Sequence, residues 1–357
     1  MILQVITDND RRGAQVFASD LHRAFEGLGE SVRTVALAPA RHDRALDFEV
    51  LGPRRRHPLT MRHLRQAMAD SSVVIGHGST TLPMCALAGQ GIATPFVYRQ
   101  ISEQRFWANT TRRRIRTRLA LRSANHVVAL WRGAAEVLAS DFAVRPSRIT
   151  IVPNGVPADR CPPVDSATRE AARERFGLVP GRPTLISIGA FAPEKGVATL
   201  VQAMQHPELA KWQLLLVGAG PERKHLEELA SQAPAGSVVI HGPVESGTEA
   251  MAAADVIGLT SRGGDSMPAV LIEAGMMGIP AVATPVEGIV DIVLDGETGS
   301  IVPLDDPAKT ASAVSKVGRD APRLGAAAQA HCLKNFAIGP VAEQWLDVLA
   351  RVQRRQN

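Results

Sequence analysis

The chain has 357 residues, of which 45 % are hydrophobic and 21 % charged; this length and composition suit two domains and exclude global disorder. The formal net charge of +5 is mild for a nucleic-acid-binding protein. Cys85, Cys161 and Cys332 are too few and too widely spaced for a disulfide framework or a zinc pattern, which favours a reducing compartment.

The first seven residues are typical of a buried strand and lack the basic start and longer apolar run of a signal peptide. No apolar run approaches the ~20 residues that a membrane span needs. We therefore expect a cytoplasmic protein whose membrane contact, if it has one, is peripheral.

Short β-branched runs alternate with helical patterns along the chain. Strands are predicted at 2–7, 31–38, 72–76, 94–99, 126–130, 149–152, 184–189, 213–217, 237–241, 256–260, 281–284 and 299–302. Helices are predicted at 14–28, 60–69, 80–89, 104–122, 133–141, 166–176, 197–204, 221–232, 246–253, 268–277, 307–317 and about 340–352. Many of the strands are apolar throughout, as parallel strands covered on both faces are. The pattern predicts an α/β protein with two doubly wound, Rossmann-like domains.

The alternation is interrupted once, where prolines gather between Pro153 and Pro183. We place a domain boundary there and predict domains at 1–160 and 161–338, followed by a C-terminal helical segment at 339–357. Two similar α/β domains imply a cleft between them, which is a usual place for a ligand.

The segment from Asp265 to Glu273 carries the strongest local signal for a site. Pro268 suits a first helical position, and the free N–H groups at such a helix start can bind an anion or a hydroxyl. Between Ser266 and Val282, Glu273 is the only ionisable side chain, and a buried lone carboxylate is costly without a polar partner. That partner is either a ligand or a neighbouring arginine.

Lys195 follows the predicted strand 184–189 and the turn at Gly189. A cation in the first turn of a helix is disfavoured by the helix dipole, so a phosphate partner would explain it; a solvated surface lysine is the alternative. Gly13 stands at a strand-to-helix turn, where it lets a ligand approach the backbone. Gly218 and Gly220 match only half of a dinucleotide fingerprint, which disfavours a nicotinamide enzyme and favours a plain tight turn.

Taken together and in order, these segments resemble the family 4 retaining glycosyltransferases of the GT-B architecture, over nearly the whole chain. The matching segments are Gly13-Ala14, Ile151 to Val156, Gly189 with Lys195-Gly196, Gly218 to Pro221, Asp265 to Ala274, Pro280 to Thr284 and Gly296 to Gly299.

The resemblance implies two facing Rossmann-like domains, the C-terminal one binding a nucleotide-diphosphate sugar and the N-terminal one an unidentified acceptor, which is a glycan, a glycolipid or a small molecule. It also implies that the C-terminal helix, 339–357, crosses back to the N-terminal domain. It implies that Lys195 neutralises the leaving diphosphate, that Glu273 holds the ribose hydroxyls and that Asp265 lies near the donor sugar. The donor site would further include Gly13, Ala14, Ser266, Met267, Pro268 and Ala269. Neither a metal nor another cofactor is expected. The expected role is sugar transfer in glycan biosynthesis, with retention of anomeric configuration.

The chain departs from the family at the phosphate loop, where Ala190 stands in place of the usual arginine. Arg262, Arg11 or Arg12 could supply the missing cation. His77, at the end of the strand 72–76, is a further catalytic candidate or else a structural group. These departures keep open an alternative function, an inactive or regulatory nucleotide-sugar-binding protein of the same fold.

A basic stretch runs from Arg112 to Arg122; between residues 104 and 135 there are eight arginines and no acidic residue. It is either a solvated helix face or a docking face for anionic lipid at the inner side of the cell membrane. A nucleic-acid partner is not expected, because no recognition motif or aromatic platform accompanies the arginines.

Overall fold

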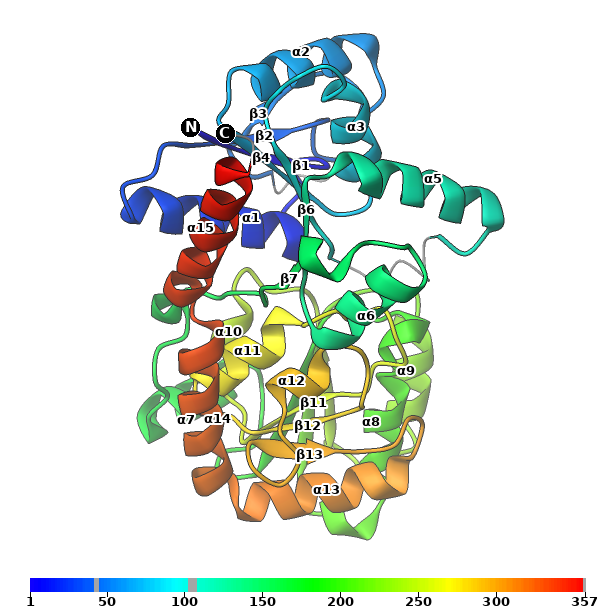
Figure 1. Ribbon diagram of the computed structural model, residues 1–357. Coiled ribbons are helices and arrows are strands. Elements are labelled where there is room, and N and C mark those ends of the chain that lie inside the picture. Colours follow the sequence, from blue (N-terminus) through cyan, green and yellow to red (C-terminus); the bar gives the residue numbers. More distant parts are fainter. Residues whose placement is uncertain (42–44, 102–107, 356–357) are drawn as a thin grey trace. The chain divides into compact units, whose positions relative to one another are not determined.

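The computed structural model describes residues 1–41, 45–101 and 108–355 (Figure 1). The chain divides into two compact units, one made of Met1–Val156 with Ala337–Asn357 and the other of Pro157–Phe336. We call them unit 1 and unit 2. The boundaries predicted from the sequence, at 160 and 338, lie a few residues after the ends of these segments at Val156 and Phe336.

Unit 1 is built on a seven-stranded sheet in the order β3-β2-β1-β4-β5-β6-β7, and every pair of neighbours is parallel. The strands are β1 (Ile2–Ile6), β2 (Val32–Ala36), β3 (Glu49–Val50), β4 (Val73–His77), β5 (Phe96–Arg99), β6 (His126–Ala129) and β7 (Ile149–Ile151). Of these, only the two-residue edge strand β3 was not predicted from the sequence, because two residues carry no periodicity.

The helices of unit 1 are α1 (Gly13–Gly27), α2 (Pro58–Ala69), α3 (Thr81–Ala88), α5 (Thr111–Ser123), α6 (Arg132–Ser140) and α15 (Ile338–Arg354). Within the described residues, α5 begins at Thr111, where Thr110 accepts a hydrogen bond from the Arg113 N–H at 3.3 Å as its N-cap. The predicted start at 104 is therefore wrong for residues 108–110, and residues 104–107 lie outside the described ranges.

The C-terminal helix α15 completes the core of unit 1. Trp345 is fully buried and packs in one apolar cluster with Phe17 and Phe25 of α1, and α1 and α15 lie side by side (Figure 1). The chain returns to this unit at Ala337, which forms a parallel bridge with Val156. Gly155 lies so close to Ile338 that a side chain at position 155 would displace it.

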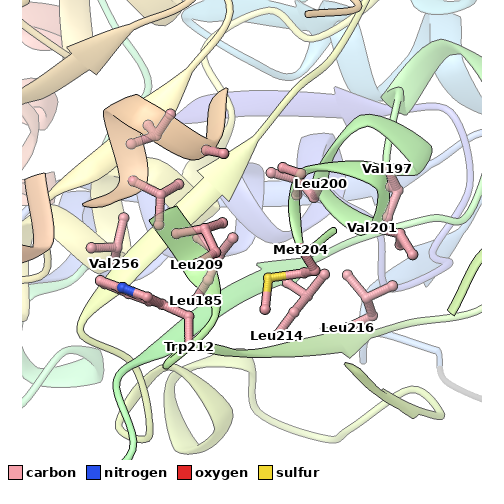
Figure 2. Close-up of a cluster of buried hydrophobic side chains, with 14 of the residues drawn as sticks. Leu185, Val197, Leu200, Val201, Met204, Leu209, Trp212, Leu214, Leu216 and Val256 are labelled. Atoms are coloured by element: carbon pink, nitrogen blue, oxygen red, sulfur yellow. The ribbon is translucent and has the colours of Figure 1, made fainter. Parts of the chain in front are cut away.

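Unit 2 contains a six-stranded, fully parallel sheet in the order β10-β9-β8-β11-β12-β13. Its strands are β8 (Thr184–Ile188), β9 (Gln213–Val217), β10 (Val238–His241), β11 (Val256–Leu259), β12 (Ala281–Ala283) and β13 (Gly299–Ile301). Buried residues of β8, β9 and β11 pack with α8 around Met204 and Trp212 (Figure 2). The two parallel sheets with flanking helices confirm the predicted Rossmann-like units.

The helices of unit 2 are α7 (Ser166–Arg175), α8 (Ala198–Ala203), α9 (Arg223–Ala230), α10 (Gly247–Met251), α11 (Ala269–Met276), α12 (Ile289–Ile292), α13 (Pro307–Arg319) and α14 (Ala321–Phe336). The sequence prediction missed α12 and α14. Several alanines and one glycine dilute the apolar period of α14, because small residues form its contact with the α11 region. A Cβ at Gly325 would overlap the Gly278 carbonyl, and one at Gly275 would overlap the Cys332 sulfur.

Candidate functional site

In unit 2 the strand order reverses between β8 and β11, because β8 leads to β9 on one side and β11 leads to β12 on the other. Open α/β sheets bind ligands outside the carboxyl ends of the strands at such a switch point. The Lys195 turn follows β8 and the Asp265 loop follows β11, so the two segments singled out in the sequence meet at this edge.

The turn that carries Lys195 is fixed to the end of β11 by its backbone. Gly196 adopts φ +58°, and a Cβ there would overlap the Thr260 carbonyl oxygen, so this contact requires glycine. The Thr260 hydroxyl donates to the Gly196 carbonyl at 2.9 Å. Lys195 ends a short 3₁₀ turn, Pro193–Lys195, before α8 begins. The helix-dipole argument for a phosphate partner is therefore wrong, and only position supports that role for Lys195.

The two predicted catalytic residues of unit 2 are in direct contact. The Lys195 ammonium forms an ion pair with Asp265, whose other carboxylate oxygen accepts from the Ser261 hydroxyl. The Lys195 side chain is 24 % exposed and that of Asp265 12 %, so both can be reached from solvent. An incoming diphosphate would compete with Asp265 for the ammonium group.

Arg262, a candidate for the missing phosphate-loop cation, lies against the Lys195 turn. Its backbone N–H donates to the Glu194 carbonyl at 2.8 Å, and its guanidinium donates to the Pro193 carbonyl at 3.1 Å. The same guanidinium donates to Asp305 at 2.7 Å. The structure thus brings Arg262 together with Lys195 and Asp265, while Ala190 is exposed in the loop after β8. Arg11 and Arg12 belong to unit 1, where Arg12 pairs with Asp8 at 2.8 Å.

The loop before α11 holds strained backbone. Met267 is buried with φ +54°, a value that costs free energy for a residue other than glycine. Glu287 closes this loop: it accepts from the Gly264 N–H at 2.9 Å and from the Ser266 hydroxyl. Pro268 precedes the helix as its N-cap residue, so α11 begins at Ala269, one residue later than predicted.

Glu273 lies on α11, and its side chain is 16 % exposed. The Arg160 guanidinium lies 3.6 Å from its carboxylate, so the arginine partner that the sequence left open exists. An exposed edge of the carboxylate still allows a ligand hydroxyl to bind.

The Gly218–Gly220 turn serves packing. Side chains at Gly218 and Gly220 would overlap the Gly189 and Phe191 carbonyl oxygens, and the Phe191 N–H donates to the Ala219 carbonyl at 2.8 Å. These glycines let the turns after β8 and β9 lie in contact, which agrees with a plain tight turn.

In unit 1, Gly13 is the first residue of α1, and Ala14 and His77 line a cavity of about 340 Å³ where the strand order reverses between β1 and β4. The His77 imidazole contacts Gln4 Oε1 at 2.9 Å and the Arg99 guanidinium at 3.3 Å. Burial, and then the charge of Arg99, hold the pKa of His77 well below its ordinary value of 6.5. His77 is therefore neutral near pH 7, where its imidazole can accept or donate a hydrogen bond.

Sequence reasoning did not single out Ser261, Glu287 or Asp305, whose side chains hold the loops of unit 2. Each lies outside a recognisable motif, and Glu287 and Asp305 come from other segments of the chain. Glu287 and Asp305 also have positive φ angles, 47° and 52°, but this feature can be seen only in the structure and not in the sequence. No group of three or more potential metal ligands occurs among the described residues.

Two family models match the chain: "Glycosyltransferase Family 4" over residues 11–160 and "Glycosyl transferases group 1" over residues 182–320. A D-inositol 3-phosphate glycosyltransferase of Xylanimonas cellulosilytica is 35 % identical over 66 % of this chain and 58 % of its own length. A phosphatidyl-myo-inositol mannosyltransferase of Mycobacterium leprae is 30 % identical over 90 % of this chain and 80 % of its own length. The chain spans little more than half the length of the X. cellulosilytica relative.

Solved structures match the whole fold. HepE from Anabaena, in complex with UDP and glucose, aligns with a TM-score of 0.82 at 19 % identity over 98 % of this chain and 99 % of its own. Sucrose-phosphate synthase from Thermosynechococcus elongatus aligns with a TM-score of 0.79 at 19 % identity over 99 % of both chains. Both family models, the near-complete mannosyltransferase match and the shared GT-B fold lead to one conclusion: the chain belongs to the family 4 glycosyltransferases.

Proposed function

We propose that the chain is a retaining glycosyltransferase that moves a sugar from a nucleotide-diphosphate sugar to an acceptor. The observation that carries this proposal is the meeting of Lys195 and Asp265 at the switch point of unit 2, beside α11 with Glu273. Relatives named as glycosyltransferases, and a structural neighbour that holds UDP and glucose, support it.

Each side chain then has one task. Lys195 exchanges Asp265 for the diphosphate and stabilises the negative charge that develops as the sugar leaves. The first N–H groups of α11, from Ala269 onward, add positive potential at the phosphate. Glu273 accepts hydrogen bonds from the ribose hydroxyls, and Asp265 accepts one from the donor sugar. The departing phosphate takes the proton of the attacking hydroxyl, so no separate base is needed.

The alternative is a nucleotide-sugar-binding protein without turnover, and the specific observation behind it is Ala190. One cation of the phosphate loop is absent there, and Arg262, which lies against the Lys195 turn, is held by Asp305 at 2.7 Å. Release of nucleoside diphosphate from the donor by the wild-type chain separates the two functions, because a pure binder releases none.

The donor site is tested by calorimetric titration with UDP, GDP, ADP and their sugar conjugates. Glu273→Ala should weaken binding of the cognate nucleotide by about tenfold or more, because hydrogen bonds to a charged group are lost. Glu228→Ala, which removes an exposed carboxylate of α9 in the same unit, is the matched control and should bind as wild type does. Equal affinity in wild type and Glu273→Ala would remove Glu273 from the donor site, and binding of none of the ligands would contradict the proposed function.

A second proposal concerns α5 and the inner face of the cell membrane. Arg114 and Arg118 are not available for lipid, because they contact Asp141, by an ion pair at 3.8 Å and by a hydrogen bond to its carbonyl at 3.0 Å. Ile115 and Leu119 are 52 % and 55 % exposed. Arg112 and Arg122 extend the same helical stripe, so α5 presents an apolar pair between two cations, as peripheral membrane helices do. The M. leprae relative, named for phosphatidylinositol, supports this contact.

A further inference from the structure

A cavity of about 750 Å³ opens in unit 1 beside the cavity that contains His77. Its walls come from the loop after β2, the loop before α2, the beginning of α3 and one face of α5. Of the residues that the structure describes, six arginines line it: Arg41, Arg54, Arg55, Arg56, Arg113 and Arg116. They come from three separate segments of the chain. The positive charge of the cavity is therefore brought together by the fold and does not come from one basic run in the sequence.

The positive charge of this cavity is not neutralised within the described part of the protein. None of the lining residues in the described ranges is acidic. Arg55 pairs with Asp8 at 2.6 Å, and the other five arginines form no ion pair with a described residue. Arg113 has a neutral partner, the side-chain oxygen of Asn109 at 3.1 Å. A concave wall with one sign of charge concentrates the potential and attracts an anion.

The chemistry of the lining selects a phosphate. A guanidinium group matches a phosphate with two parallel hydrogen bonds, and Ser79 and Thr80 add hydroxyl groups to the same wall. Among the described residues that line the cavity, none has an aromatic ring that could stack on a neutral sugar. Its volume exceeds that of a phosphate ion and is in the usual range for a small organic ligand, so the cavity has room for a phosphate that is part of a larger molecule.

The position of the cavity gives the phosphate a role. Arg55, Ser79 and Thr80 line both this cavity and the smaller one with Ala14 and His77, so the two adjoin. A molecule whose phosphate lies among the arginines could extend its remaining groups into this smaller cavity, which belongs to the predicted acceptor-binding unit. We propose that the arginine-lined cavity binds the phosphate group of the acceptor, and that the acceptor is a phosphate-bearing polyol or sugar. This inference rests on the proposed function, because only a reaction that transfers a sugar has an acceptor.

The test measures binding to the full chain by calorimetry, with glucose 6-phosphate, glycerol 3-phosphate and inositol 3-phosphate, each compared with its unphosphorylated counterpart. We expect at least one phosphate to bind about tenfold or more tightly than its counterpart. The double variant Arg113→Gln/Arg116→Gln should abolish that preference. Arg23→Gln, at an exposed arginine of α1 outside the cavity, is the matched control and should keep it.

A second arm uses vesicles of phosphatidylcholine with and without phosphatidylinositol. Binding to phosphatidylinositol vesicles that needs Arg113 and Arg116 assigns the phosphate to a lipid headgroup; binding of soluble phosphates alone assigns it to a free molecule. The inference is overturned if neither ligand class shows a phosphate preference, or if Arg23→Gln reduces it as strongly as the double variant. Nucleotide binding, measured on the same samples, reports on unit 2, so failure of the proposed function is seen separately.

Discussion

His77 ends β4 with its imidazole buried between Gln4 and Arg99. Because its pKa is below 6.5 in the folded chain and ordinary in the unfolded chain, the unfolded chain binds one more proton at mildly acidic pH. Stability should therefore be intact above pH 6.5 and fall as the pH decreases below it, by up to about 2 kcal/mol at pH 5 from this residue. Urea unfolding at pH 7.5 and pH 5 measures this loss.

The variant His77→Gln isolates the contribution of this imidazole, since glutamine can still hydrogen-bond to Gln4 and does not titrate. Its unfolding midpoint should depend less on pH than that of wild type. His225→Gln, which removes an exposed histidine, should leave the wild-type pH dependence unchanged. An identical pH dependence in wild type and His77→Gln would show that His77 is not held neutral by the fold.

At the scale of single residues, the sequence reveals what lies in local motifs. Lys195 and Asp265 each follow a recognisable strand and turn, and parallel strands bring such turns to one edge of a sheet. Glu287 and Asp305 could not be predicted, because their roles depend on contacts with loops 21 and 43 residues away along the chain. The arginine cavity has the same origin: Arg54 to Arg56 and Arg113 to Arg116 are separate basic runs until the fold joins them.

At the scale of elements, periodicity succeeds for strands and fails for α14. Strands buried on both faces are uniformly apolar and easy to recognise, whereas α14 uses Gly325 and Ala328 to approach its neighbours closely. A helix whose core face is made of small residues carries little hydrophobic contrast. The helix α5 is informative for a related reason: Leu121 is buried, but two of its large apolar residues, Ile115 and Leu119, lie on the exposed side.

The exposed pair on α5 makes the membrane contact testable. Ile115→Ser/Leu119→Ser should weaken binding to anionic vesicles by about tenfold or more, because two buried apolar side chains contribute about 1.5–3 kcal/mol each. Vesicle co-sedimentation with phosphatidylglycerol measures this change. Leu87→Ser, at an exposed leucine of α3 that is 56 % accessible, is the matched control. Binding that is equal for the two variants, or that ignores lipid charge, would exclude the contact through α5.

At the scale of the whole molecule, the two units differ in how the chain forms them. Unit 2 is one continuous segment, Pro157–Phe336, with its own sheet and apolar core (Figure 2). Unit 1 needs two segments, because α15 supplies Trp345, Val341 and Val348 to its core. Each such fully buried side chain contributes about 1.5–3 kcal/mol, and a typical domain is stable by only about 5–15 kcal/mol.

A fragment of residues 157–336 should therefore fold alone, with a single cooperative urea transition. Since Lys195, Asp265 and Glu273 all lie in it, the fragment should bind the nucleotide that the full chain binds, as calorimetry can measure. A fragment of residues 1–156 should stay unfolded by circular dichroism until a peptide of residues 337–355 is added, because its core lacks Trp345. A folded 1–156 fragment would show that α15 is dispensable, and a folded 157–336 fragment without nucleotide binding would show that the donor site needs residues of unit 1.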